Sequence, residues 1–164
     1  MPGTSQPRSA HEERILMFAP RGRDAEVMAS VLQRDGLECE AFTDFARLGA
    51  AIAEGAGAAI LAEEALQNVD ARALHAWLEA QAPWSDFPFI VLLAKTIGLQ
   101  QGAARERLGD YGNVILLERP LNAQTLRSAS ISALRARRRQ YQARDVLLDR
   151  ERTAQSLHDS RQEL

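Results

Sequence analysis

The chain has 164 residues, which is enough for one domain with some chain to spare. Hydrophobic residues make up 46% and charged residues 26%, and the net charge of −2 provides no general attraction for nucleic acid or anionic lipid. No apolar stretch reaches the roughly 18 residues that cross a membrane. Cys39 is the only cysteine, so an internal disulfide is excluded, and we expect a cytoplasmic protein from a reducing compartment.

The chain begins with a polar segment. Residues 1–13 are broken by prolines and a glycine and lack the apolar centre of a signal peptide, so we expect a disordered leader. Five apolar runs follow, and they predict strands at residues 14–19, 37–42, 58–62, 87–94 and 113–117. Amphipathic segments between these runs predict helices at residues 24–35, 43–54, 70–81 and 101–108. Asp24 and either Thr43 or Asp44 are the expected N-caps of the first two helices.

Strands and helices alternate up to residue 117 at the spacing of βαβ units. Such units form a parallel sheet with helices on both faces. The pattern predicts an α/β protein of the flavodoxin-like (βα)5 type, with a central parallel five-stranded sheet. In that arrangement the functional edge lies at the carboxyl ends of the strands.

The last predicted helix is much longer than the others. It begins near Asn122 and contains no Gly or Pro as far as Leu164, so it would extend beyond a small globule. Apolar residues recur at every seventh position with one shift of register, at Leu134, Tyr141, Leu148, Leu157 and Leu164. This weak coiled-coil pattern predicts a dimerising stalk, and the alternative is an exposed, frayed tail. The expected dimer interface comprises Leu126, Ile131, Leu134, Tyr141 and Leu148.

With this order of elements, residues 14–135 resemble the receiver domain of bacterial two-component signalling. The fifth apolar run closes in Arg119-Pro120, where that family has a Lys-Pro pair. The family also has two acids after the first strand that hold Mg²⁺, a phosphoacceptor aspartate after the third strand, and a Ser or Thr after the fourth. Clustered oxygens bind a hard cation, which offsets the charge of the transferring phosphoryl group.

The chain departs from this pattern at most of the corresponding positions. These positions fall on Ala19, Pro20, Ala62 or Glu63, Leu93, Arg119 and Pro120. Ala19 and Pro20 cannot coordinate a metal, and Leu93 has no hydroxyl group. Pro120 keeps its place, and we expect a cis peptide bond before it. Glu63 either mimics a phosphorylated aspartate by pairing with Arg119, or belongs to a solvated acidic loop or to the acidic first turn of a short helix through Leu66.

The resemblance implies a non-phosphorylatable receiver-like module for protein interaction, signal transmission and dimerisation in a bacterial sensor histidine kinase. Residues 136–164 would then form a signalling helix that leads to PAS or kinase domains of a longer chain. We expect no catalysis, cofactor, metal site, membrane contact or nucleic-acid contact in this chain. One alternative is a phosphorylatable single-domain response regulator that uses Glu63 or a rearranged acid. Another is the regulatory input domain of a different multidomain protein, such as a transcription regulator or a cyclase.

Two further features need an interpretation. A dense basic cluster, Arg135 and Arg137–Arg139, wraps most of the way round the last helix, so a solvated collar is expected rather than a nucleic-acid surface. Trp84 lies in the loop before the fourth strand, where we expect it to pack against the core.

Overall fold

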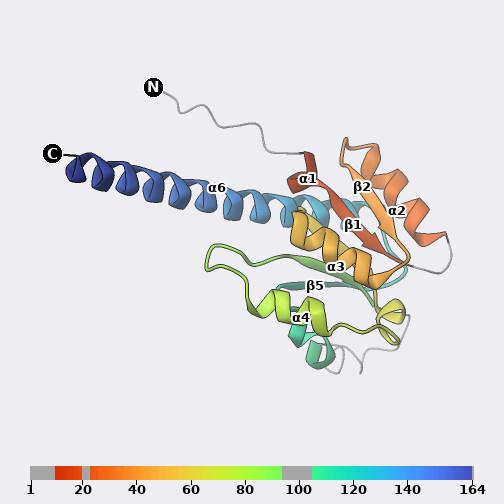
Figure 1. Ribbon diagram of the computed structural model, residues 1–164. Helices are drawn as coiled ribbons and strands as arrows, with labels where there is room; N and C mark the ends of the chain where they lie inside the picture. The colour runs from red at the N-terminus through yellow and green to blue at the C-terminus, as the bar shows by residue number, and fades with distance from the viewer. Residues whose placement is uncertain (1–9, 20–22, 94–104, 164) are drawn as a thin grey trace.

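A five-stranded parallel sheet forms the centre of the molecule (Figure 1). The computed structural model describes residues 10–19, 23–93 and 105–163. The strands are β1 (Ile15–Phe18), β2 (Cys39–Phe42), β3 (Ala58–Ala62), β4 (Phe89–Leu92) and β5 (Val114–Leu117). Their order in the sheet is β2-β1-β3-β4-β5, and every neighbouring pair is parallel. The predicted α/β sheet is therefore confirmed.

Helices cover both faces of the sheet. They are α1 (Ala10–Glu13), α2 (Asp24–Gln33), α3 (Phe45–Glu54), α4 (Arg72–Glu79) and α6 (Ala123–Gln162), with 3-10 turns η1 (Glu63–Leu66) and η2 (Gly109–Tyr111). Residues 105–107 are also helical, and the rest of the helix predicted at 101–108 lies mostly outside the described residues. None of the described helices is long and apolar enough to span a bilayer.

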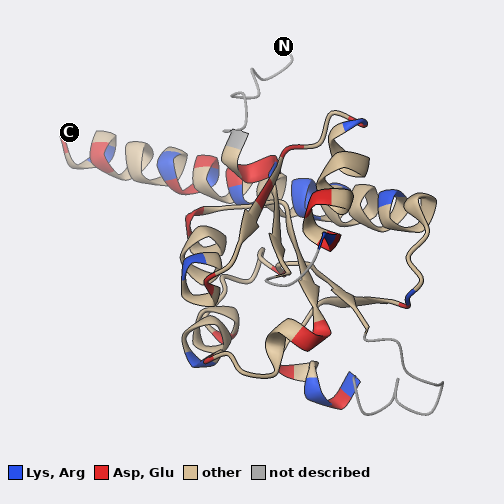
Figure 2. Cartoon of the chain, turned by 90° about the vertical axis from the view of Figure 1, so that its right-hand side faces the viewer, with Lys and Arg blue, Asp and Glu red and all other residues tan. Residues whose placement is uncertain are grey.

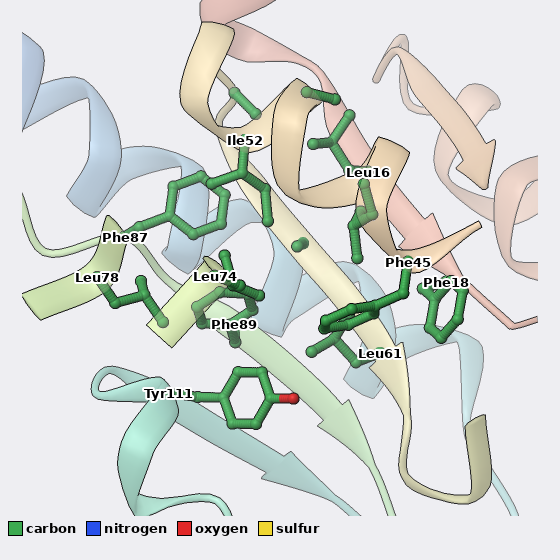
Figure 3. Packing of buried hydrophobic residues seen from close by; sticks show 14 of the residues in the cluster. Leu16, Phe18, Phe45, Ile52, Leu61, Leu74, Leu78, Phe87, Phe89 and Tyr111 are labelled. Atoms are coloured by element: carbon green, nitrogen blue, oxygen red, sulfur yellow. The ribbon is translucent and has the colours of Figure 1, made fainter. Parts of the chain in front are cut away.

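The buried side chains form two layers, one on each side of the sheet. Leu16 and Phe18 point toward α3 and α4, while Ile15 and Met17 point toward α2 and α6. This alternation follows from the two-residue period of a strand. In the first layer, aromatic rings in and beside β4 meet edge to face, and the ring centroids of Phe87 and Phe89 are 5.1 Å apart (Figure 3).

Of the expected disordered leader, residues 1–9 lie outside the described residues and residues 10–13 are helical. Ala10–Glu13 form the single turn α1. Glu12 Oε1 lies 2.6 Å from Arg144 Nη1, and Glu13 Oε1 lies 2.9 Å from Arg138 Nε. These two ion pairs tie α1 to α6, and sequence periodicity cannot detect such long-range pairing of charges.

The two expected N-caps have different outcomes. Asp44 caps α3, because its side chain accepts hydrogen bonds from Ala46 N and Arg47 N. Asp24 does not cap α2. It is the first residue of that helix, Arg23 precedes it, and no side-chain cap bond forms. The carboxylate of Asp24 is directed to Arg119 instead.

Helix α6 is one continuous element of 40 residues, as predicted, and at about 1.5 Å per residue it spans about 60 Å. Its first half packs on the sheet, and its second half projects past the sheet (Figure 1). Leu126, Leu134 and Tyr141 are only 1%, 4% and 3% exposed within the single chain, and Ile131 is half-buried. Three of the five residues expected at a dimer interface are therefore already buried by their own chain. A seven-residue spacing places apolar side chains on one side of a helix but does not say which element packs against them.

The sheet, the elements packed on it and the first half of α6 are called the body. A cluster of aromatic and cationic side chains fixes α6 to the body where the helix leaves the sheet. The guanidinium of Arg137 is 4.5 Å from the ring of Tyr141 and 5.6 Å from that of Trp84, and it is buried. Tyr141 Oη donates to Ala56 O over 3.0 Å. Arg137 is thus part of the core rather than of a solvated collar, while the half-buried Trp84 packs against the body as expected. Contacts of α6 with the rest of the chain continue past the boundary predicted after residue 135, as far as Arg144.

Candidate functional site

The carboxyl ends of the strands meet at one edge of the sheet, where the sequence predicts a degenerate phosphoacceptor pocket. Ala19 follows β1, Ala62 ends β3, and Leu93 follows β4. Ala62 and Leu93 are 3% and 6% exposed, and Ala19 is half-buried. The position of Pro20 lies outside the described residues. Three strand ends therefore present hydrocarbon side chains, which offer no ligand for a hard cation.

Arg119 follows the fifth strand and is the main cation at this edge. The peptide bond between Arg119 and Pro120 is cis, as expected. Arg119 Nη2 lies 2.7 Å from Glu64 Oε1 and 3.5 Å from Asp24 Oδ2. The Glu64 contact is an ion pair without standard hydrogen-bond geometry, since Nη2 makes no hydrogen bond. Arg119 therefore joins the start of α2 to the 3-10 turn η1.

Glu63 does not pair with Arg119 in the structure, which corrects that hypothesis. Its Oε1 lies 2.5 Å from Nη2 of Arg107, and the Glu63 side chain is 14% exposed. Glu63 and Glu64 are the first residues of η1, and successive side chains of a 3-10 helix project about 120° apart. The two neighbouring carboxylates therefore face different arginines.

Among the described residues of this edge, the charges form two sets of ion pairs. Asp24 and Glu64 face Arg119, and Glu63 faces Arg107. A divalent cation that approached these carboxylates would have to displace a guanidinium. Within residues 10–19, 23–93 and 105–163, no three His, Cys, Asp or Glu side chains come together as a metal site. The arrangement favours internal ion pairing over binding of a metal and a phosphoryl group.

An apolar groove lies beside Arg119, between α2 and the start of α6. It has a volume of about 330 Å³. Apart from Asp24 and Arg119, the lining is mainly hydrocarbon, from Val27, Met28, Val31, Leu92, Leu121 and Leu126. Such a surface suits contact with apolar side chains better than contact with an ion.

Sequence reasoning identified Arg119 and Pro120 but missed the partners of the arginine. The sequence pattern predicts Asp24 as a helix cap, and places Glu64 either in an acidic loop or in the first turn of a short helix through Leu66, which the structure has as η1. The sequence holds a signal for Asp24, because α2 follows β1 directly and its first residue therefore lies near the carboxyl edge of the sheet. The pairing of Arg107 with Glu63 had no comparable signal.

Searches against family models and against curated proteins give no match. Among solved structures, NtrX from Brucella abortus in complex with ATP is similar, with a TM-score of 0.61 and 20% identity over 82% of this chain. A response-regulator receiver domain from Clostridium thermocellum has a TM-score of 0.59 and 15% identity, covering 76% of this chain and 96% of its own. This chain has the fold of a receiver domain.

Two of the similar solved structures are a longer protein and a fusion protein. The chain matches 30% of the length of NtrX. A fusion protein that carries the trimeric coiled coil of yeast Spc42 is similar over 90% of this chain, with a TM-score of 0.60 and 18% identity. At these identities the comparisons establish the receiver fold alone.

Proposed function

We propose that the chain is a receiver-like module that accepts no phosphoryl group and acts through protein contacts and through α6. The observation that carries the proposal is the hydrocarbon lining of the sheet edge at Ala19, Ala62 and Leu93. A receiver transfers a phosphoryl group with the help of a bound cation, which neutralises the charge that develops. Ala19 and Ala62 stand where a receiver has a metal-binding carboxylate and a phosphoacceptor carboxylate. Neither alanine has an oxygen in its side chain.

The ion pairs of this edge support the same proposal. Arg119 links Asp24 of α2 to Glu64 of η1, and Arg107 holds Glu63. In a phosphorylatable site a cation and a phosphoryl group would occupy the space between such groups. Here the guanidinium groups occupy it, so the edge is held in one arrangement without a ligand.

In this proposal the output of the module is mechanical. The body is clamped to α6 through Arg137 and Tyr141, and the second half of α6 projects as a stalk. Two copies pair through this stalk in the cytoplasm, and the body biases the rotation or spacing of the pair. The setting we propose is a sensor histidine kinase, in which PAS or kinase domains of the same longer chain follow and the module itself catalyses nothing.

The experiment is treatment with Mg²⁺ and a small phosphodonor, followed by measurement of the intact mass. We expect no increase by one phosphoryl group, while a receiver domain with all of its acids, treated in parallel, gains one. A phosphoryl adduct on the wild-type chain that is lost in Glu63→Ala would establish instead a phosphorylatable regulator that uses Glu63. Glu64→Ala serves as the matched control, because it removes the neighbouring carboxylate.

A further inference from the structure

Helix α6 carries two apolar stripes, and they lie on different sides of it. The first stripe faces the body and comprises the buried Leu126, Leu134 and Tyr141. The large exposed apolar side chains of α6 are Val146 (52%), Leu147 (45%), Leu148 (42%) and Leu157 (60%). Whether these four continue the first stripe decides how two copies can meet.

Helical geometry answers this question. With Tyr141 at zero and about 100° per residue, the buried residues of α6 lie between about −80° and about 20°. Val146 and Leu157 lie at about 140° and 160°, on the opposite side, and Leu147, at about 240°, lies on the flank between the two sides. Only Leu148, at about −20°, continues the stripe that faces the body. The shift of register after Leu148 thus marks a change of face.

We infer that the stalk pairs with a second copy of this chain along the face opposite the body. The seam follows the three-and-four spacing of a coiled coil, with Ala143, Leu147, Arg150, Ala154, Leu157 and Arg161 at its inner positions. All six are exposed in the single chain. The inference rests on the proposed function and names a different interface from the one that the sequence predicts.

Three observations favour a second copy as the occupant. From Gln142 onward, every described residue of α6 except Arg144 is exposed, so about 20 residues of helix have almost no support from their own chain. In proteins most of the stability of a helix comes from packing against other elements rather than from its own propensity. Charges of both signs occur along the projecting helix, since Glu151 follows Arg150 and Asp159 precedes Arg161, and Figure 2 shows this mixture. Such a surface is compatible with itself, and the two bodies would lie on the outer sides of the pair without colliding.

The experiment compares neighbouring substitutions by sedimentation or light scattering of the whole chain over a range of concentrations. We expect a wild-type dimer. Leu147→Arg should raise its dissociation constant by about a hundredfold, because the dimer buries two copies of that side chain. Leu148→Arg, the adjacent residue of similar exposure, should leave the constant within about threefold. A second pair of substitutions tests for a gain of affinity. Arg150→Leu, in the seam, should lower the dissociation constant of the dimer at least tenfold. Arg152→Leu, on the face toward the body, should not lower it.

The outcomes separate the seam from the proposed function. If the wild type is a dimer that Leu148→Arg dissociates and Leu147→Arg does not, the seam is wrong and dimerisation stands. If the wild type and Arg150→Leu both remain monomers at every concentration, the seam and the proposed dimer both fail. Far-UV circular dichroism of each variant verifies that the body remains folded.

Discussion

The close approach of α6 to the start of β3 gives a sharp test of whether the first half of that helix belongs to the body. A Cβ at Gly57 would overlap Cδ2 of Leu134 and would lie 3.2 Å and 3.3 Å from the backbone oxygens of Glu13 and Arg14. The substitution is Gly57→Ala. Its single methyl group has no free space, because a helix side chain and two backbone oxygens surround the position.

The magnitude follows from two opposing effects. Overpacking costs about 1–3 kcal/mol, while loss of glycine flexibility in the unfolded chain returns up to about 1 kcal/mol. We expect Gly57→Ala to lower the free energy of unfolding by about 1–2 kcal/mol. Leu134→Ala alone should cost about 2–5 kcal/mol, since the side chain is 4% exposed. The double variant should be about as stable as Leu134→Ala, because the new methyl group enters the space that Leu134 leaves.

The assay is urea unfolding followed by far-UV circular dichroism. Gly49→Ala is the matched control, since a Cβ there meets nothing within 4 Å and the residue lies inside α3. We expect that control to be unchanged or up to about 1 kcal/mol more stable. If Gly57→Ala were as stable as wild type, or if its effect simply added to that of Leu134→Ala, α6 would not pack on β3 as described.

Three further predictions concern single groups. Tyr141→Phe removes the 3.0 Å bond to the carbonyl of Ala56, which keeps Arg137 Nε at 3.4 Å, and removes the acceptor of the Ala56 N–H, so it should cost about 1–3 kcal/mol in urea unfolding, whereas loss of the ring in Tyr141→Ala should cost more. Asp44→Ala removes the cap of α3 and should cost about 0.5–2 kcal/mol, with Asp44→Asn retaining most of the stability. Burial raises the pKa of Cys39 from 9.0 to about 11, so at pH 8 its thiol should react with a disulfide reagent about a hundredfold more slowly in the folded chain than in urea. Because the folded chain disfavours the thiolate, the contribution of the Cys39 thiol to the free energy of unfolding is fully present below pH 9.0 and is lost as the pH rises toward 11. Equal reaction rates of the thiol in the folded chain and in urea would refute the raised pKa.

The strands, their pairing and the long helix could be predicted because their signals are local or follow from general rules. A strand covered on both faces is a short apolar run, such as Ala58–Ala62. Right-handed connection of successive units then yields the parallel sheet. Continuous helix from Asn122 onward follows from the absence of Gly and Pro. The cis bond before Pro120 was expected from the resemblance rather than from spacing.

The partners of individual side chains could not be predicted in the same way. The spacing of Leu134 and Tyr141 places them on one face of α6, but the sheet and a second helix would both satisfy that pattern. Arg137 belongs to a basic cluster in the sequence, and only the fold brings it against Trp84 and Tyr141. Glu63 and Glu64 are adjacent, so which of them faces Arg119 depends on the 3-10 turn that they begin.

The most direct measurement for the central claim is titration of the whole chain with Mg²⁺ and beryllofluoride, which mimics a phosphoryl group on an acidic acceptor, followed by calorimetry or by backbone amide spectra. With alanines at positions 19 and 62 and the nearby carboxylates held by arginines, we predict no saturable heat and no shift of the amides that follow β1, β3 and β4. Saturable binding that depends on Mg²⁺ and shifts those amides would contradict the account, since it would require a set of oxygen ligands that the described residues of this edge do not provide.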